Sequence, residues 1–341
     1  MMDAYLILEN GKTFQGKFFG ARKNVTGEIV FTTGMTGYLE TVTDPSYYGQ
    51  IILQTFPLIG NAGFIADDCE STSVHAKAYI VKHLCQEPSN FRSEGNLDTF
   101  FRSRNITGIE GIDTRELTKI IRENGVMNGK ITSAPPTDAD QEEAKAYKIE
   151  NAIGSVSNMS ILKEGESESR VAVLDLGVKH STIQAFTSRG CAVWRFPHDT
   201  SAKQILAINP SGVLLSSGPG NPADPGNAAI IETIKELQNH VPIFGICIGH
   251  QLLAMANGYE TRKLKFGQRG SNQPVKCLET GRVYMTGQNH GYEVIADNPS
   301  FVNVNDGTCE GLDYGSSFSV QFIPGNDTAF LYDQFIERMG N

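Results

Sequence analysis

Apolar residues in the second half of the chain are grouped into short runs, and segments with the spacing of an amphipathic helix lie between them. The apolar runs are typical of buried strands and cover residues 171–175, 191–195, 212–216 and 241–246. The helical segments lie near residues 180–188, 202–208, 228–238 and 251–256. This alternation of strands and helices predicts an α/β fold with a mostly parallel sheet flanked by helices.

The first part of the chain has a less regular pattern. Residues 28–33 and 50–56 combine β-branched and apolar side chains between Gly, Pro and Asn, which is typical of strands. Apolar residues at helical spacing predict helices over residues 74–84 and 114–124. We therefore expect a mixed α/β domain in this part.

The segment between the two patterns contains Pro135-Pro136, many charges and a run of Glu, Gly and Ser at residues 164–169. Such a composition favours a connection between domains, and we expect one short helix in it, near residues 141–147. The sequence predicts an N-terminal domain over residues 1–145, a linker over residues 146–169 and a C-terminal domain over residues 170–341.

The composition agrees with a two-domain globular protein. The chain has 341 residues, of which 40% are hydrophobic, and no apolar run is as long as a membrane span. The formal net charge of −9 argues against nucleic-acid binding. Six scattered cysteines form neither a Cys-x-x-Cys pair nor a zinc-finger spacing, and the first residues do not resemble a signal peptide. We therefore expect a cytoplasmic protein without a metal site.

Candidate chemistry first appears at Cys247, which lies between an apolar strand and a helical run. Gly245 and Gly249 stand two residues before and two residues after it, as in the G-x-nucleophile-x-G turn. A helix N-terminus favours the thiolate, and the N–H of Ile248 is placed to stabilise an oxyanion. Without further motifs, a buried cysteine near a strand end, which is common in apolar cores, is the alternative interpretation.

A second loop, at residues 216–222, follows the strand predicted over residues 212–216 and contains Gly218-Pro219-Gly220. In parallel α/β sheets, ligands bind outside the carboxyl ends of the strands, so both loops are expected at one edge. Together they resemble the class I (triad) glutamine amidotransferases.

Further motifs resemble the small subunit of carbamoyl phosphate synthetase, and they run through both expected domains. They are Gly34-Met35-Thr36-Gly37-Tyr38, Thr43-Asp44-Pro45-Ser46-Tyr47, Ser89-Asn90-Phe91-Arg92, Gly111-Ile112-Asp113-Thr114-Arg115, Lys265-Phe266-Gly267 and Gln288-Asn289-His290-Gly291-Tyr292. Other amidotransferases of this class lack the N-terminal part, which makes the resemblance specific.

The resemblance implies a glutaminase in which Cys247 attacks L-glutamine and ammonia passes to a large synthetase subunit. The residues that correspond to the family's glutamine site are Ser46, Gly218, Gly220, Ile248, Gln251, Asn289, Gly291 and Tyr292. It also implies that ATP and Mg²⁺ act on the large subunit. This chain has no P-loop and is expected to need no cofactor. Both arginine and pyrimidine biosynthesis are open as the pathway served.

Two parts of this site have simpler interpretations when they are taken alone. Residues 288–292 could form only a turn between strands. Ser46, directly after Pro45, is typical of a β-turn serine.

The sequence departs from the family after residues 318–322, Phe-Ser-Val-Gln-Phe. The family continues with His-Pro-Glu, the acid/base and its carboxylate partner, whereas this chain continues with Ile323-Pro324-Gly325, and no histidine follows His290. Three explanations remain open: natural loss of activity, an altered or incompletely recorded sequence, or another base. His250 and His290 are the nearest candidates for another base.

We expect the chain as written to bind glutamine but to hydrolyse it very slowly, because loss of the base of a triad costs several powers of ten in rate. A non-catalytic partner subunit for a synthetase that uses free ammonia is the main alternative. A glutaminase for anthranilate or guanylate synthesis is a third, which the N-terminal motifs disfavour.

Overall fold

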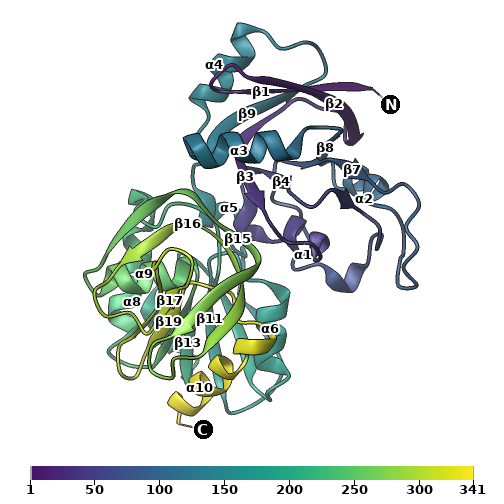
Figure 1. Ribbon diagram of the computed structural model, residues 1–341. Coiled ribbons are helices and arrows are strands. Elements are labelled where there is room, and N and C mark those ends of the chain that lie inside the picture. Colours follow the sequence, from purple (N-terminus) through teal and green to yellow (C-terminus); the bar gives the residue numbers. More distant parts are fainter. Residues whose placement is uncertain (1, 341) are drawn as a thin grey trace. The chain divides into compact units, whose positions relative to one another are not determined.

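Residues 2–340 are described by a computed structural model, shown in Figure 1. The chain divides into two units. The first comprises the residues up to Glu150 together with Lys265–Arg269, and the second comprises Asn151–Leu264 together with the residues from Gly270 onward.

The first unit is built on a closed β-barrel with the strand order β1-β2-β8-β6-β4-β3-β9. Its strands are β1 (Asp3–Leu8), β2 (Thr13–Gly20), β3 (Val25–Thr32), β4 (Gln50–Gln54), β5 (Leu58–Ile59), β6 (Ala78–Val81), β7 (His83–Leu84), β8 (Thr107–Glu110) and β9 (Met127–Thr132), of which β5 and β7 form a separate pair. Its helices are α1 (Tyr38–Val42), α2 (Leu97–Ser103), α3 (Thr114–Asn124) and α4 (Asp138–Ala146).

Successive residues of the barrel strands enter two different cores. In β4, Ile51 and Leu53 pack with α3, whereas Ile52 packs with α1 and α2. This two-sided burial follows from the alternation of side chains along a strand. It explains why the strand is apolar at consecutive positions.

The helix predicted over residues 74–84 is wrong. Residues 78–81 form β6, which lies between β4 and β8 and runs parallel to both. All four side chains of β6 are fully buried, and Tyr79 donates its hydroxyl to Gln54 Oε1 at 3.0 Å. A short apolar segment that is buried on both faces has no period that separates strand from helix.

The second unit is an α/β sheet of ten strands in the order β10-β12-β11-β13-β14-β19-β18-β17-β15-β16. The strands are β10 (Leu162–Glu164), β11 (Arg170–Asp175), β12 (Ala192–Pro197), β13 (Gly212–Leu215), β14 (Ile243–Ile246), β15 (Glu260–Cys277), β16 (Val283–Ile295), β17 (Phe301–Asn303), β18 (Cys309–Asp313) and β19 (Phe318–Val320). The helices are α5 (Ala152–Val156), α6 (His180–Thr187), α7 (Ala202–Leu206), α8 (Ala228–Leu237), α9 (Ile248–Ala256) and α10 (Phe330–Arg338).

The predicted alternation of strands and helices is confirmed, because β12, β11, β13, β14 and β19 are parallel neighbours. Helices cover both faces of this parallel part (Figure 1). Val171 and Val173 of β11 pack with α6 and α10, while Ala172 and Leu174 pack with α7, α8 and α9. The sheet therefore separates two apolar cores.

The structure differs from the linker expected over residues 146–169. Within this segment, α5 and β10 belong to the second unit, and β10 pairs antiparallel with β12 at the edge of the sheet. Glu164 of β10 forms an ion pair with Arg195 at 2.8 Å, and the Nζ atom of Lys163 lies 5.2 Å from the ring centre of Trp194. The charges that suggested a linker therefore belong to an edge strand.

No helix within residues 2–340 is long and apolar enough to cross a membrane.

Candidate active site

Cys247 occupies the turn between the end of β14 and the start of α9. Its backbone has φ 55° and ψ −109°, and the other non-glycine residues with positive φ among residues 2–340 are all asparagines. Such a conformation is strained for cysteine and persists only where the surroundings hold it. The N–H of Cys247 donates to the carbonyl oxygen of Val320 at 3.0 Å, which ties the turn to β19.

The two glycines around Cys247 are required by close packing of the backbone. A Cβ on Gly249 would lie 2.2 Å from the carbonyl oxygen of Leu215, and one on Gly245 would lie 2.7 Å from that of Gly249. Neither partner is a flexible side chain, so α9 can approach β13 and β14 this closely only with glycine at both positions.

The glycine loop after β13 is packed against the same turn. A Cβ on Gly218 would lie 1.9 Å from the carbonyl oxygen of Leu176 and 3.3 Å from Cγ2 of Ile248. Gly220 has φ +103°, a conformation that favours glycine. The structure therefore brings Gly218 and Ile248, the two expected sources of oxyanion N–H groups, to one place.

The third part of the site is the Gln288–Tyr292 segment, which lies within β16 and is not a turn. Sγ of Cys247 lies 3.7 Å from the carbonyl oxygen of Asn289. Gln251 on α9 donates from Nε2 to the carbonyl oxygen of Tyr292 at 2.9 Å. Asn289, Tyr292, Gln251 and Cys247 are thus neighbours, and Gly291 is in the same strand between Asn289 and Tyr292.

Ser46 belongs to the other unit. It lies in the 3₁₀ turn Pro45–Tyr47, and its N–H donates to the carboxylate of Asp44 at 2.8 Å. Its hydroxyl is buried and has no hydrogen-bond partner among the described residues. A buried hydroxyl without a partner is unusual, and a bound polar ligand would satisfy it.

The segment after β19 reaches the same edge of the sheet. β19 runs parallel to β14, with Val320 opposite Ile246. Ile323 donates its N–H to the carbonyl oxygen of Gly287 at 2.9 Å and packs against the apolar cluster that contains Cys247. The apolar side chain of Ile323 thus stands directly after residues 318–322, where the resemblance led us to expect a histidine.

His250 is placed to pack inside the protein rather than to act as a base. Its ring is fully buried on α9, and Nδ1 lies 2.7 Å from the hydroxyl of Ser319. Burial and, to a smaller extent, the charge of His290 lower the pKa of His250 to about 3. A base with so low a pKa is inefficient near neutral pH.

His290 also has both ring nitrogens engaged. Nδ1 lies 2.8 Å from the carbonyl oxygen of Tyr292, and Nε2 lies 2.9 Å from Oε1 of Gln288. Gln288 in turn donates to the buried Glu310 at 2.9 Å. Sequence reasoning named Gln288 only as part of the motif at residues 288–292, and it did not identify Glu310 or Gln321, although Gln321 accepts from Gln251 at 3.0 Å.

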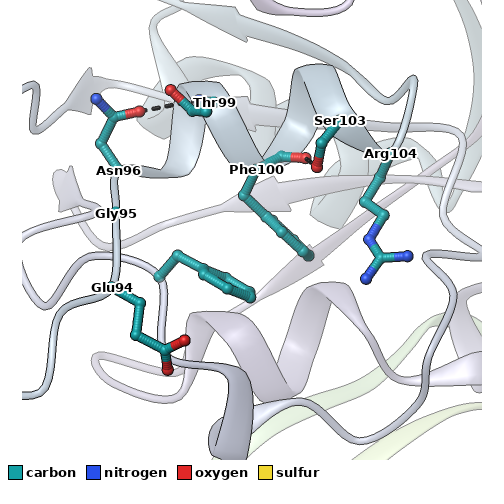
Figure 2. A pocket seen from close by; sticks show the side chains of 8 residues that line it. Glu94, Gly95, Asn96, Thr99, Phe100, Ser103 and Arg104 are labelled. Atoms are coloured by element: carbon teal, nitrogen blue, oxygen red, sulfur yellow. Dashed lines mark hydrogen bonds between the residues drawn. The ribbon is translucent and has the colours of Figure 1, made fainter.

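A separate hollow of about 400 Å³ lies in the first unit beside α2 (Figure 2). The rings of Phe64 and Phe100 are stacked in it with their centres 4.6 Å apart, and the guanidinium of Arg104 lies 5.9 Å from the Phe100 ring. None of its lining residues belongs to the predicted glutamine site.

The parallel sheet, the cysteine at the strand–helix turn and the glycine loop define the second unit as a class I glutamine amidotransferase fold. Residues 172–328 match the family model described as glutamine amidotransferase class-I, and residues 6–131 match the one described as carbamoyl-phosphate synthase small chain, CPSase domain.

Full-length relatives narrow this assignment. The chain is 46% identical to the carbamoyl phosphate synthase small chain of Clostridium perfringens, over 98% of this chain and 99% of that protein. It is 43% identical to the small chain of Lactococcus lactis subsp. cremoris, over 100% and 99%. A pyrimidine-specific small chain of Halalkalibacterium halodurans is 44% identical over 99% and 97%. The chain belongs to the carbamoyl phosphate synthase small chain family.

Proposed function

We propose that this chain is the glutamine-binding subunit of a carbamoyl phosphate synthetase, with Cys247 as the nucleophile for L-glutamine. The observation that carries the proposal is the strained turn at Cys247, which is packed against Ile248, Gly218 and the Asn289–Tyr292 segment. Full-length similarity to small chains supports a large subunit as the partner. ATP and Mg²⁺ are expected on that subunit.

The reaction proceeds by attack of the Cys247 thiolate on the carboxamide carbon of glutamine. The C–N bond then breaks, ammonia leaves after taking up a proton, and a thioester remains on Sγ. Water cleaves the thioester to give glutamate and the free thiol. The N–H of Ile248 and those of the Gly218–Gly220 loop are the groups proposed to stabilise the oxyanion of both tetrahedral intermediates.

The proton transfers are the weak step in this chain. No histidine follows His290, and Ile323 stands directly after the residues Phe318–Phe322 that precede the family's histidine. His250 is neutral, buried and hydrogen-bonded to Ser319. General acid/base catalysis contributes about 10²- to 10⁴-fold to such reactions. We therefore propose that the chain binds glutamine and hydrolyses it slowly.

The test reconstitutes the full chain with its large subunit and measures glutamine binding and ammonia release separately. We expect saturable glutamine binding, together with ammonia release at least about 10²-fold slower than with the Clostridium perfringens small chain. A rate equal to that of the relative and abolished by Cys247→Ala would contradict slow hydrolysis. Absence of glutamine binding would contradict the glutamine site itself.

A second candidate function is a non-catalytic subunit that supports a synthetase using free ammonia. The apolar Ile323 beside the cluster of Cys247 favours it. In that case, carbamoyl phosphate synthesis from ammonia would require this chain, and Cys247→Ala would leave this synthesis unchanged.

A further inference from the structure

A buried carboxyl group lies behind the candidate site and has no role in the reaction described above. Glu310 on β18 is fully buried, and its Oε1 accepts hydrogen bonds from Gln288 Nε2 and Asn303 Nδ2, both at 2.9 Å. Its second oxygen, Oε2, is buried and has no hydrogen-bond partner among the described residues. A carboxyl group held in this way is costly unless it is compensated.

The bonds of Glu310 fix the orientation of Gln288. Nε2 of Gln288 faces Glu310 Oε1 and also lies 3.4 Å from the hydroxyl of Thr286. That hydroxyl donates to the carbonyl oxygen of Gln273 at 2.9 Å, so it can only accept from Gln288. The other end of the amide, Oε1, is therefore the atom that faces His290 Nε2.

This orientation determines the protons of His290. Both neighbours of its ring are oxygens that only accept: Gln288 Oε1 at 2.9 Å and the carbonyl oxygen of Tyr292 at 2.8 Å. Two acceptors require an N–H on each ring nitrogen, which is the imidazolium form.

We propose that Glu310 is a positioning residue that acts through Gln288 to hold His290 as an imidazolium and so fixes the Asn289–Tyr292 segment against Cys247. The carbonyl oxygen of Tyr292 is shared by His290 and Gln251, and that of Asn289 faces the thiol. If His290 loses a proton, its ring can no longer donate to both Gln288 Oε1 and the carbonyl oxygen of Tyr292. Either one of these two hydrogen bonds is lost, or Gln288 turns its amide and loses its bond to Glu310.

Several titratable groups surround this chain of contacts. Asp306 and Cys309 lie near Glu310, Glu293 lies on the strand of His290, and His250 faces His290 from α9. Burial raises the pKa of Glu310 to about 8, against the hydrogen bonds from Asn303 and Gln288, which lower it. Glu310 therefore takes up a proton close to neutral pH, and its Oε1 can accept the hydrogen bonds from Gln288 and Asn303 in either protonation state.

The consequence for glutamine affinity rests on the proposed function, whereas the protonation of His290 does not. The first test is ¹⁵N NMR of histidine-labelled full chain, with the His290 signal assigned by its absence in His290→Asn. We expect the imidazolium signature at pH 7. In Glu310→Gln and in Gln288→Leu, the pKa of His290 should fall by one unit or more, a tenfold loss of proton affinity.

The matched control is Glu293→Gln, which removes another buried carboxylate from β16, one that pairs with Arg262 at 2.6 Å. It should leave the pKa of His290 unchanged. A neutral His290 at pH 7, or a pKa that neither Glu310→Gln nor Gln288→Leu moves, would overturn the proposal. Gln288→Leu keeps Glu310 itself and serves if Glu310→Gln does not fold.

The second test measures the dissociation constant of glutamine from pH 6 to 9 in the complex with the large subunit. The unsubstituted chain should lose affinity as pH rises through the pKa of His290, and Glu310→Gln should shift this loss to lower pH. If the NMR result holds but no glutamine binds, the proposed function fails and the positioning role of Glu310 stands.

Discussion

The backbone N–H of Ile323 donates to the carbonyl oxygen of Gly287 at 2.9 Å, which joins the segment after β19 to the start of the Gln288–Tyr292 segment. Ile323-Pro324-Gly325 therefore begins beside the candidate site. In the family that the sequence resembles, His-Pro-Glu stands after this strand.

The double substitution Ile323→His and Gly325→Glu should raise glutaminase activity. It would supply an imidazole with a carboxylate two residues later, next to the cluster that contains Cys247. We expect a gain of about 10²-fold in ammonia release, the scale of general acid/base catalysis. Activity should disappear when Cys247→Ala is added. If the doubly substituted chain binds glutamine but gains no activity, the backbone after β19 does not place these side chains for catalysis.

Gly249→Ala should destabilise the unit that contains Cys247. The added methyl group would lie 2.2 Å from the carbonyl oxygen of Leu215, so α9 or β13 must shift. Overpacking of this kind costs about 2 kcal/mol of unfolding free energy. Urea denaturation followed by circular dichroism measures it. Gly287→Ala is the matched control, because nothing lies within 4 Å of its added Cβ. Equal effects of the two substitutions would contradict the close approach.

The buried His250 should make the same unit sensitive to acid. Its folded pKa is lowered to about 3, whereas in the unfolded chain it has its ordinary value near 6.5. Below pH 6.5 the unfolded state binds the proton and the folded state does not. The stability contributed by neutral His250 is therefore lost as pH falls from 6.5 toward 3, by about 2 kcal/mol at pH 5.

Unfolding free energies at pH 7 and pH 5 test this expectation. His250→Gln should show a smaller loss of stability between the two values than the unsubstituted chain. The exposed His240, replaced by Gln, is the control and should keep the full loss. A loss of the same size in His250→Gln would show that other groups cause the acid sensitivity.

The sequence predicts secondary structure where the local spacing of apolar residues and the helix caps indicate it. Residues 114–124 were expected as a helix and form α3, because the apolar spacing is periodic and Asp113 accepts from the N–H of Glu116 at 2.9 Å. Residues 74–84 showed a similar apolar spacing but contain β6, because a segment buried on both faces is apolar without a helical cause. Local pattern decides an element only where one face remains in water.

Contacts across the sheet could not be predicted in the same way. Glu310 and Gln288 are 22 residues apart in sequence. They meet only because β16 and β18 are in contact in the folded unit. The motif around Gln288 could be recognised, but its partner Glu310 could not, because nothing in the local sequence Cys-Glu-Gly-Leu-Asp of β18 distinguishes a buried Glu from an exposed one.

Phe91 should contribute to binding of the large subunit. It is 96% exposed in the first unit, within the Ser89–Arg92 motif, and neighbouring Arg92 pairs with Asp68 at 2.7 Å. An exposed aromatic side chain beside an ordered ion pair is typical of a protein interface. We expect Phe91→Ala to weaken the affinity for the large subunit about tenfold, since truncation of an interface aromatic commonly costs 1–2 kcal/mol or more.

The measurement is the dissociation constant of the two-subunit complex, together with the unfolding midpoint of the isolated chain. Because Phe91 is almost wholly exposed, the midpoint should not move. Met159→Ala is the matched control: this side chain is 94% exposed but lies in the second unit, and its replacement should leave the affinity unchanged. If Phe91→Ala leaves the affinity unchanged as well, the exposed ring serves no contact with the large subunit, and its motif must be explained within the first unit.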